Sequence, residues 1–214
     1  MLHSSRYHAA RAHNGISGPQ DQRSGIFFTI PVALGAAATS ATAPLTWKLM
    51  EITDSFVLLV RKESLTISEH GSIWGEIRCR FSGDQHFPEA RWTDFVVVVL
   101  GWWLESIVTL VDGRERNATI RFMDGPFKVN VFAKRLDSWG AELVEGRVAG
   151  DQVLHRVEFA PDSFIDSLIQ ASDETVEACA ENGWTTDAID FVLKQREQLI
   201  QCRNKGLGWD RRPI

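Results

Sequence analysis

The side chains best suited to acid and base chemistry are few and scattered. After residue 50 the chain contains three histidines, His70, His86 and His155. His86 follows Asp84 by two positions in a polar stretch, so the two could form an acid and base pair. His155 alternates with valines, which predicts a buried histidine on the apolar face of a strand. We assign no catalytic residue, and an enzyme with an unrecognised site built from His86, Asp84 or Asp124 is kept as an alternative.

Motifs of the common cofactor and nucleophile classes are missing. The chain has no GxxxxGK[ST], GxGxxG, GxSxG or HExxH sequence. Its cysteines, Cys79, Cys179 and Cys202, are widely spaced and form no CxxC pair. This spacing predicts reduced thiols and argues against a zinc site or a disulfide framework. We therefore expect no cofactor and no metal.

The charge of the chain is unevenly distributed. Its net charge is −5, but the residues before Met50 include four basic side chains and one acidic, which leaves 19 basic and 27 acidic residues in the rest. Binding to a nucleic-acid duplex requires clustered Lys and Arg, so a nucleic-acid partner is not expected. An acidic body attracts positively charged molecules, which favours a basic protein as partner.

The first 49 residues differ from the rest. Residues 1–25 have no apolar periodicity and predict disorder. Residues 26–43 combine a preceding Arg, an apolar run and a small-residue end, a pattern typical of a secretory signal. The favoured interpretation is that translation starts at Met50 and that residues 1–49 are a misassigned extension; a signal peptide and a genuine tail stay open. The protein is expected to be cytoplasmic, or secreted if the signal is real.

The stretch from Trp92 to Leu110, WTDFVVVVLGWWLESIVTL, is the most apolar part of the chain. A membrane span needs about 20 apolar residues. The run from 95 to 111 contains Glu105 and has Asp94 and Asp112 at its ends, so we expect no membrane span. Its apolar residues recur at spacings of three and four, which predicts an amphipathic helix over about 90–110. Four consecutive valines favour the alternative, a strand over residues 95–100.

The polar side of this predicted helix supplies the candidate interface. Asp94 and Glu105 fall along it with Asp112, and Trp102 lies at its border. Asp94 and Glu105 are eleven residues apart, about 16 Å of helical rise, which is too far for a pair of glycosidase carboxyl groups. An acidic stripe bordered by an aromatic ring is typical of protein interfaces. A merely solvated helix face is the alternative.

The remaining segments predict an antiparallel sheet followed by helices. Residues 56–61 and 64–68 are rich in β-formers and indicate a hairpin, and residues 73–81 alternate as a half-buried strand. Four more strands are expected between residues 118 and 159, with a turn at Asp124 and Gly125. Helical periodicity begins at Pro161 and continues to about residue 203. We predict one α+β domain over 50–203, in which the 90–110 helix packs on an antiparallel meander, and a loose tail over 204–214.

Two stretches, FPEARWTDFVVVVLGWWLESIVTL and FMDGPFKVNVF, carry a resemblance to uncharacterised small bacterial proteins, some of them immunity-like companions of secreted toxins. It spans about residues 50–159. The residues that carry it are Phe87, Pro88, Trp92, Asp94, Trp102, Trp103 and 122–126, and their types indicate structural roles.

The sequence therefore favours a non-enzymatic domain that binds another protein, with an immunity-like role implied by the resemblance. A structural subunit of a larger assembly is a further alternative. The oligomeric state is not predicted.

Overall fold

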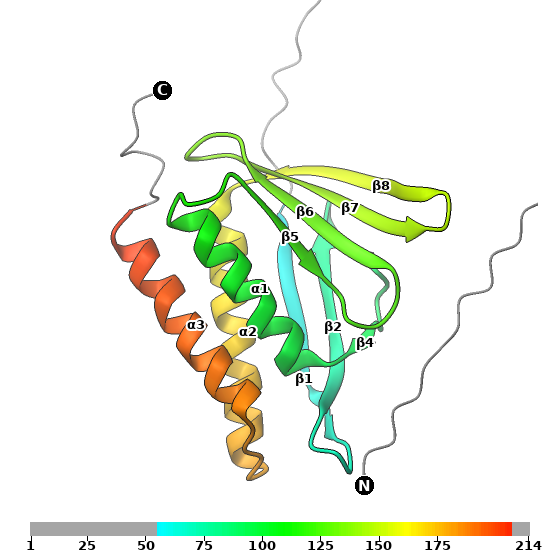
Figure 1. Cartoon of the computed structure of the whole chain (residues 1–214), viewed down its shortest axis with the longest axis vertical. Helices are drawn as coiled ribbons and strands as arrows, with labels where there is room; N and C mark the ends of the chain where they lie inside the picture. Colours follow the sequence, from blue (N-terminus) through cyan, green and yellow to red (C-terminus); the bar gives the residue numbers. More distant parts are fainter. Residues whose placement is uncertain (1–54, 207–214) are drawn as a thin grey trace, which may run out of the picture. The chain divides into compact units, whose positions relative to one another are not determined.

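The structure, a computed structural model, describes residues 55–206 (Figure 1). The predictions for residues 1–49 and for most of the 204–214 tail lie outside this range. The strands are β1 (Val57–Ile67), β2 (Ile73–Phe81), β3 (Gln85–Phe87), β4 (Thr93–Asp94), β5 (Asn117–Arg121), β6 (Phe127–Ala133), β7 (Trp139–Arg147) and β8 (Gly150–Phe159). The helices are α1 (Val96–Val111), α2 (Pro161–Glu181) and α3 (Asp187–Asn204). The predicted α+β class is confirmed.

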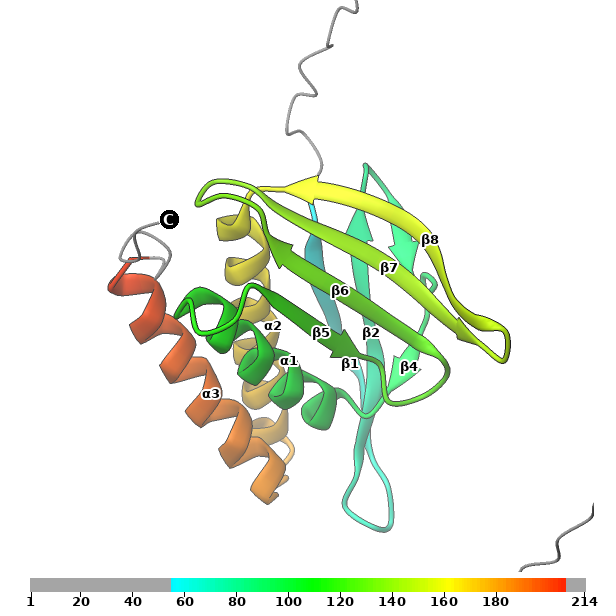
Figure 2. The ribbon, with the colours of Figure 1, turned by 45° about the horizontal axis from the view of Figure 1, so that its top comes forward.

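The strands form two antiparallel sheets. Sheet A has the order β1-β2-β3, with β4 also paired to β2, and sheet B is the meander β5-β6-β7-β8. The three helices lie together on one side of the domain and the sheets on the other (Figures 1 and 2). Helix α1 packs against α3, β5 and β2, while α2 packs along β1. The antiparallel meander is therefore present, and the strands before α1 form a separate sheet.

The predicted hairpin over residues 56–68 is wrong, because this segment is one long strand. Strand β1 pairs with β2 along its length, and the pairing shifts between Arg61 and Thr66. The Ser64 hydroxyl spans this irregularity: it donates to the carbonyl of Arg61 at 2.6 Å and accepts the N–H of Glu76 at 2.7 Å. Residues 62 and 63, Lys and Glu, are not turn formers, so the chain bulges here and does not reverse.

The amphipathic helix is confirmed, but it begins later than predicted. Helix α1 starts at Val96, whereas Thr93 and Asp94 pair with β2 as the short strand β4. The alternative strand over 95–100 is wrong. Val96, Val97 and Val99 are all buried, so the apolar packing they gain exceeds their weak intrinsic helix preference. No helix within residues 55–206 is long and apolar enough to cross a membrane.

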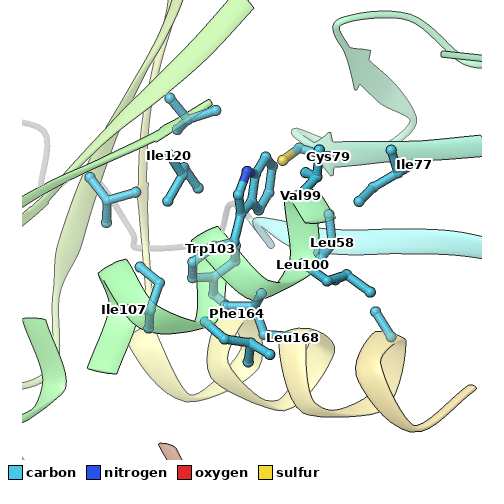
Figure 3. Packing of buried hydrophobic residues seen from close by; sticks show 14 of the residues in the cluster. Leu58, Ile77, Cys79, Val99, Leu100, Trp103, Ile107, Ile120, Phe164 and Leu168 are labelled. Atoms are coloured by element: carbon cyan, nitrogen blue, oxygen red, sulfur yellow. The ribbon is translucent and has the colours of Figure 1, made fainter. Parts of the chain in front are cut away.

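Trp103 lies at the centre of the core. Its side chain is fully buried and extends from α1 towards Cys79 of β2, with Ile120 of β5 on the other side (Figure 3). The indole N–H donates to the carbonyl of Arg121 at 2.8 Å, and the ring meets Phe122 edge-on at a centroid distance of 5.1 Å. One side chain of α1 thus joins both sheets, as large aromatic residues with a satisfied N–H commonly do.

The C-terminal helices begin and end as their sequence predicts. Pro161 opens α2, and Asn182 and Gly183 end it, with Gly183 in the left-handed region at φ +69°. The Thr186 hydroxyl accepts the N–H of Ile189 and caps α3. Helix α3 approaches α1 closely at Gly101, where a Cβ would lie 2.7 Å from the Phe191 ring.

His155 is not the buried histidine that its strand pattern predicts. It lies on the same face of β8 as Val157 and Phe159, yet it is exposed. The β7–β8 hairpin extends past the rest of the fold at this end (Figure 2), so the inner face has little to cover it there. The imidazole instead lies at the margin of the core, 5.0 Å from the Phe81 ring.

Candidate functional site

Asp94 is the first of the predicted interface residues, and its placement corrects that prediction. Its side chain is 0% exposed. Oδ1 accepts the N–H of Phe95 at 2.7 Å, and Oδ2 accepts the N–H of Met123 at 2.8 Å and the indole N–H of Trp92 at 3.3 Å. The N–H of Asp124 lies 3.2 Å from both oxygens. A carboxyl group occupied in this way is closed to a partner and instead joins the start of α1 to the β5–β6 turn.

The stretch around Trp92 and the turn at residues 122–126 meet at this carboxyl group. The turn bonded to Asp94 includes Gly125, at φ +76°, where a Cβ would lie 2.8 Å from the Trp92 ring. The same ring packs edge-on against Phe127 and Phe122, at centroid distances of 5.1 and 6.3 Å. The quoted residues at this junction therefore have structural roles, as their types indicate.

The other three predicted interface residues lie on the exposed face of α1. Trp102, Glu105 and Asp112 are exposed and follow one another at spacings of three and seven, so they share one side of the helix. Trp102 is 44% exposed. Asp112 pairs with Arg114, with Oδ2 and Nε 3.0 Å apart, whereas the Glu105 side chain makes no hydrogen bond or ion pair with any residue in 55–206. We call Trp102, Glu105 and Asp112 the α1 patch.

The residues considered for acid and base chemistry do not converge on one place. His86 Nε2 lies 3.4 Å from Asp84 Oδ1, so the predicted pair forms, but the Asp84 side chain is 91% exposed. Asp124 is exposed on the β5–β6 turn, and His70 is exposed beside the turn between β1 and β2. Within the described range, no three His, Cys, Asp or Glu side chains are grouped to hold a metal ion.

The cysteines are unpaired thiols with little tendency to ionise. Cys79 and Cys179 are buried and Cys202 is partly exposed. Burial raises the pKa of Cys79 and of Cys179 above the usual range. Burial also raises the pKa of Cys202, with a smaller contribution from the nearby Asp112 carboxylate. A thiol that stays protonated is a poor nucleophile and metal ligand.

Sequence reasoning missed a basic group on sheet A. The residues of β2 alternate between buried and partly exposed, and the partly exposed set includes Arg78 and Arg80. Arg80 pairs across the strands with His86 on β3. The alternation visible in the sequence already put both arginines on one face. The pairing that adds His86 depends on the strand order, which the alternation does not reveal.

Comparisons of the chain with models of known protein families, with curated proteins and with solved structures found no match. The exposed side chains and surfaces of the domain are therefore the evidence on its function.

Proposed function

We propose that this domain is non-enzymatic and binds another protein, a basic one, through the α1 patch. Such a domain could act as immunity-like proteins do, by covering a toxin. The observation that carries the proposal is the 44% exposure of Trp102 on a rigid helix, beside an unpaired carboxylate. Trp is the residue most enriched at interface hot spots, and a large apolar ring left in water gains free energy when a partner covers it.

The chemistry of the α1 patch favours a Lys or Arg side chain as its central contact. Glu105 lies three residues after Trp102 and is one turn further along the same face. A cation can pair with the carboxylate while it rests on the indole face, an arrangement worth about 0.5–2 kcal/mol for the ring contact alone. Asp112 contributes less, because Arg114 already offsets its charge. The net charge of −5 adds long-range attraction for a basic partner.

The test is capture of partners on the immobilised full chain, in lysate of the native host, over a series of salt concentrations. Two variants disrupt the patch, Trp102→Ala and Glu105→Lys. Their matched controls are Leu136→Ala, which truncates another exposed apolar residue in the β6–β7 loop, and Glu181→Lys, which reverses an exposed charge at the end of α2. The expected result is a stoichiometric basic protein that both patch variants lose and both controls retain, with binding weakened by salt.

Other outcomes assign the protein differently. If all four variants retain the partner, the α1 patch is not part of the interface. Recovery of the protein alone, with light scattering that shows a defined oligomer, would favour the structural-subunit alternative. A turnover in an activity screen that His86→Ala abolishes would establish the enzyme alternative.

A further inference from the structure

The outer face of sheet A carries a group of cationic and imidazole side chains. Along β2, Arg78 and Arg80 are two residues apart and share the face that points away from the buried residues Ile77 and Cys79. Arg80 is directly opposite His86 on β3. Directly opposed residues have Cβ atoms about 5 Å apart. We call Arg78, Arg80 and His86 the basic cluster.

Several side-chain nitrogen atoms in the basic cluster are buried and have no hydrogen-bond partner. Arg78 Nε and Nη1, Arg80 Nε and His86 Nδ1 are buried and make no hydrogen bond within residues 55–206; they are four of the six such side-chain atoms in that range. Buried polar groups are almost always paired, because an unpaired one has lost its hydrogen bonds to water and gained none in return. Their concentration on one face indicates that an acceptor from outside the domain belongs there.

The charges around the cluster do not supply that acceptor. The carboxylate nearest to Arg78 is Glu76, with Oε2 3.6 Å from Nη1, and Oε1 of the same group already accepts from Arg61 at 3.3 Å. The Arg80 side chain forms neither an ion pair nor a hydrogen bond with any described residue. Glu63 Oε2 also lies 4.0 Å from Arg61 Nε, so these acidic side chains pair with Arg61 and Arg78, and the Arg80 guanidinium has no ion pair within residues 55–206.

An external ligand can reach Arg80. This side chain lines an open groove between β1 and α2 with a volume of ≈ 220 Å³. The α2 side of the groove carries Asp166, which pairs with Arg203, and Glu174, which accepts from the amide of Gln170. Arg203 offsets the charge of Asp166, and neither acidic group forms an ion pair with Arg80, so the guanidinium of Arg80 is available.

We propose that the basic cluster binds an oxyanion, a phosphate or carboxylate group of a ligand. A guanidinium offers a planar fork of donors that matches both groups, and two neighbouring forks favour the higher charge of phosphate. The site lies on β2 and β3, so it is independent of the α1 patch and of the function proposed for it.

The experiment titrates the full chain with inorganic phosphate, with sodium chloride at matched ionic strength as reference and sodium acetate as a parallel arm. The arginine side-chain N–H signals and the His86 ring signals are followed by NMR. We expect saturable shifts of the Arg78, Arg80 and His86 signals with phosphate. Arg80→Gln should weaken binding by at least about tenfold, because it removes the charge and the fork of donors that would pair with the oxyanion. A stronger saturable response to acetate would assign a carboxylate ligand.

The control is Arg135→Gln, which removes the same charge from an exposed Arg paired with Asp137 in the β6–β7 loop, and it should bind phosphate as wild type does. If Arg80→Gln fails to fold, Arg80→Lys is used, which keeps the charge and loses the fork; it should bind more weakly than wild type. Shifts that stay linear in both phosphate and acetate, or that are equal in wild type and the Arg80 variant, would overturn the proposal.

Discussion

Asp94 and the basic cluster both hold polar atoms out of solvent on sheet A, and they differ in whether those atoms have hydrogen-bond partners. Each oxygen of Asp94 accepts two or more N–H groups. The basic cluster has four buried nitrogen atoms without a hydrogen-bond partner. Burial alone therefore does not tell a structural group from a binding group. A buried polar group whose hydrogen-bonding atoms all have partners stabilises the fold. A buried group whose atoms lack partners lowers the stability of the free protein, and a ligand that supplies the partners can bind there.

The largest effect is expected at the satisfied group. Asp94→Ala leaves the N–H groups of Phe95, Met123 and Asp124 without their acceptor in a buried place. At about 1–3 kcal/mol for each unsatisfied group, partly relieved by water, the loss should be on the order of 4 kcal/mol in the free energy of unfolding. Urea denaturation measures it.

The graded control is Asp94→Asn, which keeps the shape and one acceptor oxygen, so its loss should be smaller than that of Asp94→Ala. If Asp94→Ala is as stable as wild type, Asp94 does not stabilise the fold, and it does not differ from the basic cluster in the way we infer.

The placement of Asp94 also shows where sequence reasoning ends. The helix around Trp103 was predictable because its apolar residues recur at local spacings. Asp94 fits the same pattern, but its position is decided by a turn 29 and 30 residues further along the chain. Helical periodicity is a local pattern and does not reveal such a distant contact, so it predicts Asp94 on the polar, candidate interface side of the helix.

The same limit explains the sheets and the candidate sites. The Gly183 helix end, the Thr186 cap and the turn at Gly125 depend on neighbouring residues and were predictable. Two sheets in place of one meander, and His86 beside Arg80, depend on which strands pair. The α1 patch could be found from the sequence because helical spacing places its three residues together. The basic cluster could be found only in part, from the alternation of β2.

The second prediction concerns the unsatisfied group. Arg80→Met removes a charge that has no partner within residues 55–206 and keeps the apolar stem. We expect the free energy of unfolding to rise by about 1 kcal/mol, because replacing buried charges by apolar groups is often neutral or stabilising.

Urea denaturation in a buffer without phosphate or carboxylate measures this change, with Arg135→Met as the exposed control, for which no change is expected. If the free energy of unfolding instead falls by 1 kcal/mol or more in Arg80→Met, Arg80 has a stabilising interaction in the free protein. Asp94 and the basic cluster would then both stabilise the fold.

Ser138 and Glu158 provide an intermediate case, a satisfied pair at the edge of the core. The buried Ser138 hydroxyl donates to Glu158 Oε1 at 2.6 Å. This hydrogen bond, followed by that from Lys134, lowers the pKa of Glu158 below its usual value. Ser138→Ala should raise this pKa and reduce stability at neutral pH by about 1 kcal/mol.

The pH dependence follows from the direction of that shift. A carboxyl whose folded-state pKa is lowered stabilises the fold above its unfolded-state pKa, and this contribution is lost as the pH falls through the lowered value. The difference between Ser138→Ala and wild type should therefore shrink in acid. NMR titration of Glu158 and urea denaturation at several pH values test this, and a difference that stays constant down to the lowest pH would contradict it.

The smallest effect is expected at an exposed carboxyl group, which has neither the partners of Asp94 nor the buried atoms of the cluster. Asp112 is half-exposed and paired with Arg114, so Asp112→Asn should change stability by less than about 0.5 kcal/mol.

The charge of Asp112 nevertheless contributes, after burial, to the raised pKa of Cys202. Removing it should lower that pKa and increase the rate of thiol labelling at mildly alkaline pH by a small factor, on the order of twofold. Asp137→Asn, at an exposed Asp paired with Arg135, is the matched control and should leave the rate unchanged. Slower labelling in Asp112→Asn would mean that Asp112 does not act on the thiol as a charge. If Asp112→Asn changes the labelling rate of Cys202 and leaves the free energy of unfolding unchanged, Asp112 affects the reactivity of the surface and, unlike Asp94, does not stabilise the fold.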